Sequence, residues 1–526
     1  MIASRRSSLL PGSSRWIRLV ILAWIAVPAV LGMQILIGSQ ARRSSQPPEL
    51  IKEAKLPGHV AVLSGLRTQS CSTSNCHGSL TPDLREDAIR ADEYFVWLND
   101  PHAQAHRTLF GEKSRAIFQR LGVADEQLRP LEGQADRFHA AWANCLACHE
   151  TNSQLALSAG TAESAGAADH PAMTAAEGVS CESCHGNAQD WLHRHYRPEW
   201  KALSREEERE LGYIPGEDVA ARTSRCVSCH VGSSGGDVNH DLIAAGHPAL
   251  RFESVWYQSR LPQHWKPGRR AATERIAGQT QQPPDTATTH PTRDWLIGQL
   301  VTASASLEQL ERRASGPSSR ASWPEFAEDN CFACHHDLMG NSWRRERGIP
   351  GLAALGSKKS RLAVPWGNWN LELIPILADQ FGSRESQDFS VALGHLRDSI
   401  GEGPMEVINQ SRVARRHLEA WLPAVSKLSE SDAARMLQQI GRSDPEKLVS
   451  SWDRTATLVL GFAAPYHASQ TIPDPLKIAM NRVRLPDVPV AFDSPRDFRS
   501  ADNRQSLTAN QWIELLRQLS ELVPEH

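Results

Sequence analysis

Residues 178–186 read Gly-Val-Ser-Cys-Glu-Ser-Cys-His-Gly, with cysteines at 181 and 184 and a histidine directly after the second. The same Cys-x-x-Cys-His arrangement recurs at residues 145–149, 226–230 and 331–335. A fifth pair has a longer spacer, Cys71-Ser-Thr-Ser-Asn-Cys76-His77. The chain has 10 cysteines, and these five pairs use all of them. One repeated chemical purpose therefore accounts for every cysteine.

The repeated histidine indicates covalently bound haem. The sequence Cys-x-x-Cys-His is the attachment signal for haem c, in which two thioether bonds hold the porphyrin and the histidine binds the iron. Structural zinc commonly uses two Cys-x-x-Cys pairs together, which does not suit an odd number of pairs. Disulfides between such close cysteines would close only short loops. A thioredoxin-like site would be a single motif in a βαβ setting. We expect five haem c groups, attached at Cys71, Cys76, Cys145, Cys148, Cys181, Cys184, Cys226, Cys229, Cys331 and Cys334, with proximal ligands His77, His149, His185, His230 and His335.

The remaining histidines are concentrated in the same part of the chain. Beyond the motifs, residues 51–340 contain His59, His102, His106, His139, His170, His193, His195, His240, His247, His264, His290 and His336, whereas residues 341–526 contain only His395, His417, His467 and His526. This enrichment favours a second histidine on each iron. Methionine can also bind haem iron, but only Met173 and Met339 lie near the motifs. For any single histidine, a surface or hydrogen-bonding role is the alternative.

Several segments resemble a known family. Residues 178–186 followed by Trp191-Leu-His-Arg-His195, together with Asp100-Pro-His-Ala103, resemble multihaem cytochromes of the cytochrome c554 type, relatives of hydroxylamine oxidoreductase and the octahaem tetrathionate reductases. Residues 239–248 and 323–338 resemble an uncharacterised branch of such cytochromes. The resemblance covers roughly residues 60–345. It implies a mostly helical, haem-stacked fold with two histidines per iron. On that pattern the distal ligands are His102, His195 and one or both of His240 and His247.

The resemblance does not carry a catalytic centre with it. The related pentahaem nitrite reductases use a lysine in place of one motif histidine, and no Cys-x-x-Cys-Lys occurs here. Hydroxylamine oxidoreductases use a tyrosine near the active haem, and none of the five tyrosines here is a recognisable match. No catalytic residue is assigned.

The N-terminus predicts export. Residues 19–38 are free of charged side chains and follow Arg5, Arg6, Arg15 and Arg18. Twenty such residues are long enough to span a bilayer, which suggests an anchor in the cytoplasmic membrane. Ser39-Gln40-Ala41 resembles a cleavage site, so a cleaved signal with release into the periplasm is the alternative. The basic flank favours a periplasmic haem domain.

The predicted fold is mostly α, with little regular strand. Three regions are expected: residues 1–45 as anchor or signal and tether, 46–345 as a pentahaem cytochrome c domain, and 346–526 as a haem-free helical domain. Apolar residues recur at helical spacing over 296–310 and 412–428. Ser443-Asp-Pro-Glu446 and Thr508-Ala-Asn-Gln511 read as capping boxes that begin two further helices. Residues 153–178 and 266–292 read as loops.

Two functions are compatible with these features. An electron carrier needs only irons with two protein ligands each, and would exchange electrons with redox partner proteins, such as a quinol-linked donor. An oxidoreductase acting on a small nitrogen or sulfur compound needs one open iron, for which the longer first motif is the candidate. A ligand sensor or scaffold is a third reading. The formal net charge of −3 gives no indication of nucleic-acid binding.

Overall fold

The computed structural model describes residues 68–83, 85, 89–151, 177–265, 290–316, 323–329, 366, 369–400, 403–449, 452–467, 471–483 and 509–524. The chain divides into two compact units, residues 1–62 and 63–526, and all described residues belong to the second. The proposed span at 19–38 and the fifth motif, with Cys331, Cys334 and His335, lie outside the described residues. None of the described helices is long and apolar enough to cross a membrane.

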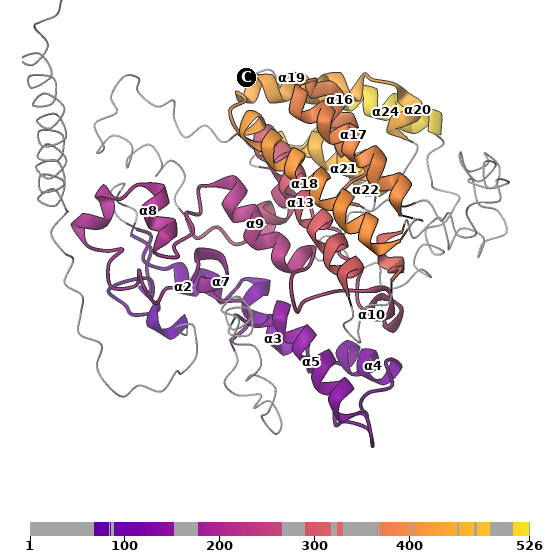
Figure 1. The fold of residues 1–526 in the computed structure, drawn as a ribbon. Helices are drawn as coiled ribbons and strands as arrows, with labels where there is room; N and C mark the ends of the chain where they lie inside the picture. Colours follow the sequence, from indigo (N-terminus) through magenta and orange to yellow (C-terminus); the bar gives the residue numbers. More distant parts are fainter. Residues whose placement is uncertain are drawn as a thin grey trace, which may run out of the picture. The chain divides into compact units, whose positions relative to one another are not determined.

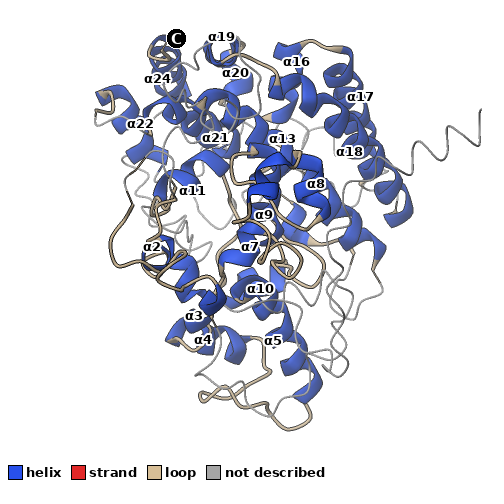
Figure 2. Cartoon of the chain, turned by 90° about the vertical axis from the view of Figure 1, so that its left-hand side faces the viewer, coloured by secondary structure: helices blue, strands red, loops and turns tan. Residues whose placement is uncertain are grey.

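The fold is helical, which confirms the predicted class. Figure 2 shows helices and loops only, and the described residues contain no strand beyond three isolated bridges. Around the motifs the elements are η1 (Thr68–Ser70), α2 (Glu93–Trp97), η2 (Pro101–Gln104), α3 (Ala105–Thr108), α4 (Glu112–Arg120), α5 (Ala135–His149), α7 (Cys181–His185), η4 (Pro198–Ala202), α8 (Arg205–Glu210), α9 (Val219–His230), α10 (His240–Ala245) and α11 (Ser254–Arg260). They are followed by α13 (Pro291–Ser315), η5 (Phe326–Glu328), α16 (Ile374–Phe381), α17 (Arg384–Ser399), α18 (Pro404–Ser426), α19 (Glu430–Gly441), α20 (Pro445–Leu448), α21 (Trp452–Ala463), η8 (Ala464–Tyr466), α22 (Asp474–Val483) and α24 (Ala509–Glu521).

Helix α13 lies at the centre of the later helices. It contains the predicted helix 296–310 and extends it at both ends. Its buried side chains lie on all sides, as expected of a helix surrounded by protein. It packs against α18 and α19 and also against α9 and α11. Figure 1 shows α13 running beside α18. The helix thus joins the large apolar core to the helices that carry the motifs.

The large core is built mainly from residues after 290. Trp295, Leu307, Phe389 and Trp421 are fully buried in it, with Leu418 and Val425 from the predicted face of α18. Burial of this apolar surface is the main driving force for the packing. By contrast, a small cluster that contains Phe118, Phe138 and Trp142 packs against Cys145 and Leu146 of the second motif.

One helix start differs from the sequence expectation. Ser443 was expected to cap a helix running past residue 448, but Asp444 caps the short α20 and its side chain accepts a hydrogen bond from the Glu446 N–H. Pro445 occupies the first helical position and has no N–H to be capped, which moves the cap one residue along. The Ser443 hydroxyl donates to the Ile440 carbonyl instead. The expected cap at Thr508 lies outside the described residues.

Candidate functional site

Three of the described motifs occupy the last turns of helices. Helices α5, α7 and α9 end at His149, His185 and His230. Side chains three and four positions apart lie on one face of a helix. The two cysteines and the histidine of each motif therefore face the same side, as attachment of one porphyrin requires.

The first motif reaches a similar arrangement without a helix. The His77 N–H donates to the Cys71 carbonyl at 3.3 Å, so the longer spacer folds back on itself. The Gly78 N–H donates to the Thr73 carbonyl at 3.0 Å. A Cβ on Gly78 would lie 1.9 Å from the Ser72 carbonyl oxygen, so the tight return requires glycine. The two additional residues are accommodated as a turn.

Three motif histidines each lie opposite a second histidine at nearly the same ring-centre distance. The ring centres of His77 and His195 are 6.2 Å apart, those of His185 and His264 are 6.2 Å apart, and those of His102 and His230 are 6.1 Å apart. An imidazole nitrogen lies about 2 Å from a metal that it binds, so two imidazoles on opposite sides of one metal have ring centres about 6 Å apart. All three separations match this value.

His149 has two histidine neighbours. Burial lowers the pKa of His106 and lowers that of His247 to about 4, and in each case the nearby His149 lowers it further. Among the described residues, no ring faces His149 in the way that the other three motif histidines are faced. The second motif thus has two candidates for its second ligand, and His247 was the one expected.

The second nitrogen of most of these rings is held by a hydrogen bond. Five Nδ1 atoms contact an oxygen acceptor: His77 with Glu93 at 3.1 Å, His102 with Asp100 at 2.9 Å, His149 with the Ala105 carbonyl at 2.9 Å, His195 with the Leu192 carbonyl at 2.8 Å, and His247 with the Pro248 carbonyl at 2.8 Å. Metal-binding histidines almost always donate their other N–H in this way, which fixes the tautomer and the ring orientation. In this tautomer Nε2 is the nitrogen that carries the lone pair needed to bind a metal.

Burial keeps several of these rings neutral. It lowers the pKa of His185 to about 4 and that of His230 to about 3, with smaller contributions from neighbouring histidines. Burial also acts to lower the pKa of His102, but the hydrogen bond and charge of Asp100 raise it overall. A neutral imidazole is the form that binds a metal. The lowered pKa values of His185 and His230 therefore favour ligation by these two rings at ordinary pH.

Contacts between motifs order them in space. A hydrogen bond with Cys181 lowers the pKa of the Cys71 thiol, which places the first motif beside the third. Arg225 on α9 donates to the Ser183 carbonyl at 2.8 Å, which joins the fourth motif to the third. Helix α9 also packs against α5, and a hydrogen bond with Cys229 raises the pKa of Cys148. The order in space is first, third, fourth, second.

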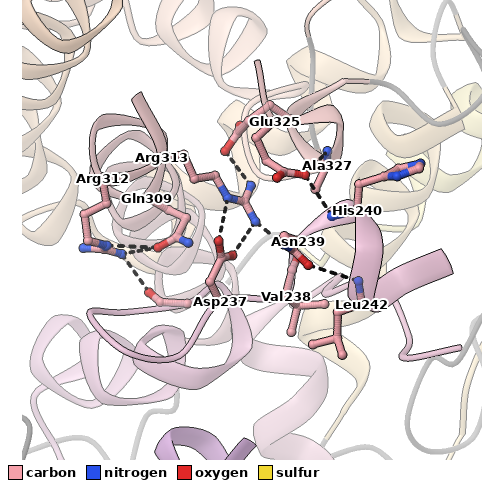
Figure 3. Close-up of polar contacts among 12 residues, drawn as sticks. Asp237, Val238, Asn239, His240, Leu242, Gln309, Arg312, Arg313, Glu325 and Ala327 are labelled. Atoms are coloured by element: carbon pink, nitrogen blue, oxygen red, sulfur yellow. Dashed lines mark hydrogen bonds and ion pairs between the residues drawn. The ribbon is translucent and has the colours of Figure 1, made fainter. Parts of the chain in front are cut away.

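His240 belongs to a different cluster. Arg313, from α13, is 8% exposed and forms ion pairs with Asp237 and Glu328, both at 2.6 Å. The His240 N–H donates to Glu325 at 2.8 Å, and the His240 ring lies edge-on to Phe326 at 5.8 Å. Figure 3 shows the His240 ring pointing away from Arg313. This expected ligand thus lies against the residues that lead into the fifth motif and faces none of the described motif histidines.

One facing histidine was missed from the sequence. His264 follows Pro262 and Gln263 after the end of α11. No sequence pattern distinguishes it from the other histidines near the motifs. His102 and His195, by contrast, were expected and do face motif histidines. Only the folded chain brings His264 opposite His185, because the two are far apart in sequence.

The residues present fit haem c. The eight described motif cysteines are free thiols, and the ring centres of three histidine pairs are separated by the distance expected for two imidazoles on one iron. The backbone also approaches one motif sulfur closely at Gly236, because a Cβ there would lie 2.9 Å from the sulfur of Cys148. Two cysteine sulfurs can form the thioether bonds to one porphyrin, and two imidazoles can occupy the two axial positions of its iron.

One of three comparisons with known proteins found a similarity. Residues 70–186 match the family model for cytochrome c554 and c-prime. The matched segment contains the first three motifs and His102. Neither a comparison with curated proteins nor one with solved structures found a match. The matched segment, about a fifth of the chain, is thus similar to cytochromes c554 and c-prime.

Proposed function

We propose, on the premise that residues 70–186 are of the cytochrome c554 type, that this protein is a pentahaem c-type cytochrome that transfers electrons between redox partner proteins. The observation that carries the proposal is the set of three histidine pairs with ring centres 6.1 to 6.2 Å apart. Bound haem would supply the one-electron Fe(III)/Fe(II) couple. An iron held by two histidines has no open position for a substrate, so electron transfer is the activity that this ligand set favours.

The ligand assignment follows the pairs. His195 would complete the first site, His264 the third and His102 the fourth. His247 is proposed for the second site, because its Nδ1 is held by the Pro248 carbonyl and its partly buried ring lies near His149. The fifth haem is inferred only from the sequence motif at residues 331–335. His240 is proposed as its second ligand because it contacts Phe326, five residues before Cys331.

The location is part of the proposal. Haem c attachment suits an exported protein, and residues 19–38 would either anchor it in the cytoplasmic membrane or be removed as a signal. In both cases the haem-binding region would face the periplasm. An anchored protein would be positioned to accept electrons from a quinol-linked donor in the same membrane.

The alternative is an oxidoreductase with one open iron, acting on a small nitrogen or sulfur compound. The first motif was the candidate for that iron because of its longer spacer. The second motif is now the stronger candidate. His195 faces His77, whereas His149 has neighbouring histidines but, among the described residues, no ring directly opposite.

Carbon monoxide binding to the reduced protein tests the assignment. The unaltered protein should show no spectral change, and its denatured chain should retain five covalent haems. His195→Ala should open one iron and give a carbon monoxide signal amounting to one haem. His193→Ala is the matched control, because His193 is exposed and lies only two residues away. A one-haem signal from the unaltered protein would favour the oxidoreductase. A silent His195→Ala variant would overturn the pairing.

A further inference from the structure

The hydrogen bonds behind the facing histidines are of two kinds. His77 and His102 use carboxylates, those of Glu93 and Asp100, at 3.1 and 2.9 Å. His149, His195 and His247 use backbone carbonyls at 2.8 to 2.9 Å. His185 and His264 also hydrogen-bond the backbone, at Ile214 and Pro262. Carboxylate partners therefore occur at the first and fourth sites, and backbone partners occur at the other two described sites.

Both carboxylates are held in place and shielded from water. The Asp100 side chain is 9% exposed and also accepts the His102 backbone N–H at 2.9 Å, as the N-cap of η2. The Glu93 side chain is 18% exposed and belongs to the first residue of α2. That helix is fastened to the first motif, because the Tyr94 N–H donates to the His77 carbonyl at 2.9 Å. Neither bond depends on a freely rotating surface side chain.

The two kinds of partner affect a bound iron differently. A carboxylate that accepts the Nδ1 proton makes the imidazole a more basic, more electron-donating ligand than a carbonyl does. A more strongly donating ligand and a nearby negative charge both stabilise Fe(III) over Fe(II). The reduction potential falls as a result, and low polarity around the pair strengthens the effect.

We propose that Glu93 and Asp100 set low reduction potentials at the first and fourth sites, so that low and higher potentials alternate along the spatial order first, third, fourth, second. This inference rests on the proposed function, because it requires that His77 and His102 bind haem iron. Glu93 and Asp100 are positioning and tuning residues that act through the histidines.

Two substitutions remove the charge and keep the hydrogen bond. In Asp100→Asn and Glu93→Gln, the remaining amide oxygen can still accept the Nδ1 proton. In a potentiometric titration each variant should raise the midpoint potential of one haem and leave the others near their original values. We expect at least a tenfold shift of that Fe(III)/Fe(II) equilibrium toward Fe(II), which corresponds to about 59 mV for one electron.

The controls separate tuning from loss of structure. Asp432→Asn removes the same charge from α19, where the Asp432 side chain is 45% exposed, and should shift no haem. Asp100→Glu and Glu93→Asp retain a carboxylate and should restore a low potential. Unchanged midpoints in variants that keep five low-spin haems would overturn the inference while the proposed function stands. Potentials that all move together would also overturn it.

A measurement on the unaltered protein avoids the variants altogether. Proton NMR of the haem methyl groups during stepwise reduction orders the individual haems. The first and fourth sites should be reduced after the second and third. If either is reduced first, the inference is wrong even if Asp100→Asn should fail to fold. Failure to find histidine-ligated haems at His77 and His102 would instead refute the proposed function.

Discussion

The helices that carry the motifs differ from those of the C-terminal part in what they pack against and, at the third motif, in length. Helix α7, which ends at His185, has 5 residues, and α9 and α5 have 12 and 15, whereas α17 and α18 have 16 and 23. The long helices share one large apolar core, which also includes Val227 of α9, whereas the small cluster around Trp142 packs against the second motif at Cys145 and Leu146. A short helix is marginal without tertiary support. The difference indicates that bound haem provides the missing core around the motifs, while the C-terminal helices are stabilised by their own side chains.

The largest expected effect is the loss of a haem. Replacing Cys181 and Cys184 by serine should remove one covalent haem. Helix α7 and the residues around it would then lack the porphyrin ring against which they are proposed to pack. Haem content should fall by one per chain. In limited proteolysis, the motif region should be cleaved at earlier times than residues 404–441. Retained protease resistance around the motifs would contradict the proposed role of haem as core.

The converse test truncates the apolar core of the C-terminal helices. Trp421 is fully buried, and Trp421→Ala should lower the free energy of unfolding by about 3 to 5 kcal/mol. The visible spectrum of the folded variant should be unchanged, because the tryptophan belongs to the core of the long helices. Thermal unfolding and the reduced spectrum measure the two parts separately. A change in haem spin state would show that the two regions are coupled more closely than their cores suggest.

Arg313 connects the two regions from the end of α13. Arg313→Met would leave Asp237 and Glu328 without the guanidinium that compensates their charges, at an expected cost of about 3 to 5 kcal/mol. The neighbouring Arg312 is a matched control, because its pair with Glu308 is partly exposed. Arg312→Met should cost about 1 kcal/mol or less. Equal losses of thermal stability in the two variants would contradict the role of the buried pair.

Glu253 should make stability depend on pH. It lies just before α11 and is 1% exposed, and burial raises its pKa from 4.5 to about 7. A carboxyl group with a raised pKa in the folded state stabilises the fold at low pH. That contribution is lost as pH rises from about 4.5 through about 7, and is on the order of 3 kcal/mol. Glu253→Gln should flatten this part of the curve of melting temperature against pH. An unchanged slope would exclude Glu253 as its source.

The smallest effect distinguishes two glycines in helices. A Cβ on Gly461 of α21 would lie 2.6 Å from the Trp295 ring, whereas one on Gly394 of α17 would meet nothing within 4 Å. Alanine normally improves a helix interior by about 1 kcal/mol over glycine. Gly394→Ala should therefore raise the melting temperature. Gly461→Ala should lower it, because overpacking costs about 1 to 3 kcal/mol. If both variants were stabilised, the close contact of α21 with α13 would be in doubt.

The amount that could be predicted differs between parts of the site. The cysteines and proximal histidines are adjacent in sequence, so their chemistry could be read directly, and the helical class followed from apolar spacing. His102 and His195 were found through the segments around them. The residues around His264 resemble no known segment of that family. The second ligand at His149 is also not decided by spacing, because His106 and His247 both lie near it.

The sequence alone determined the kind of cofactor and the mostly helical fold, because both depend on residues that are neighbours along the chain. Attachment needs two cysteines and a histidine within one turn, and helices need apolar residues at regular intervals. The tertiary structure decided which histidines face each other, the spatial order of the motifs and which imidazoles have carboxylate partners. These depend on residues far apart in sequence, such as His185 and His264, whose separation is fixed only by how the intervening helices pack.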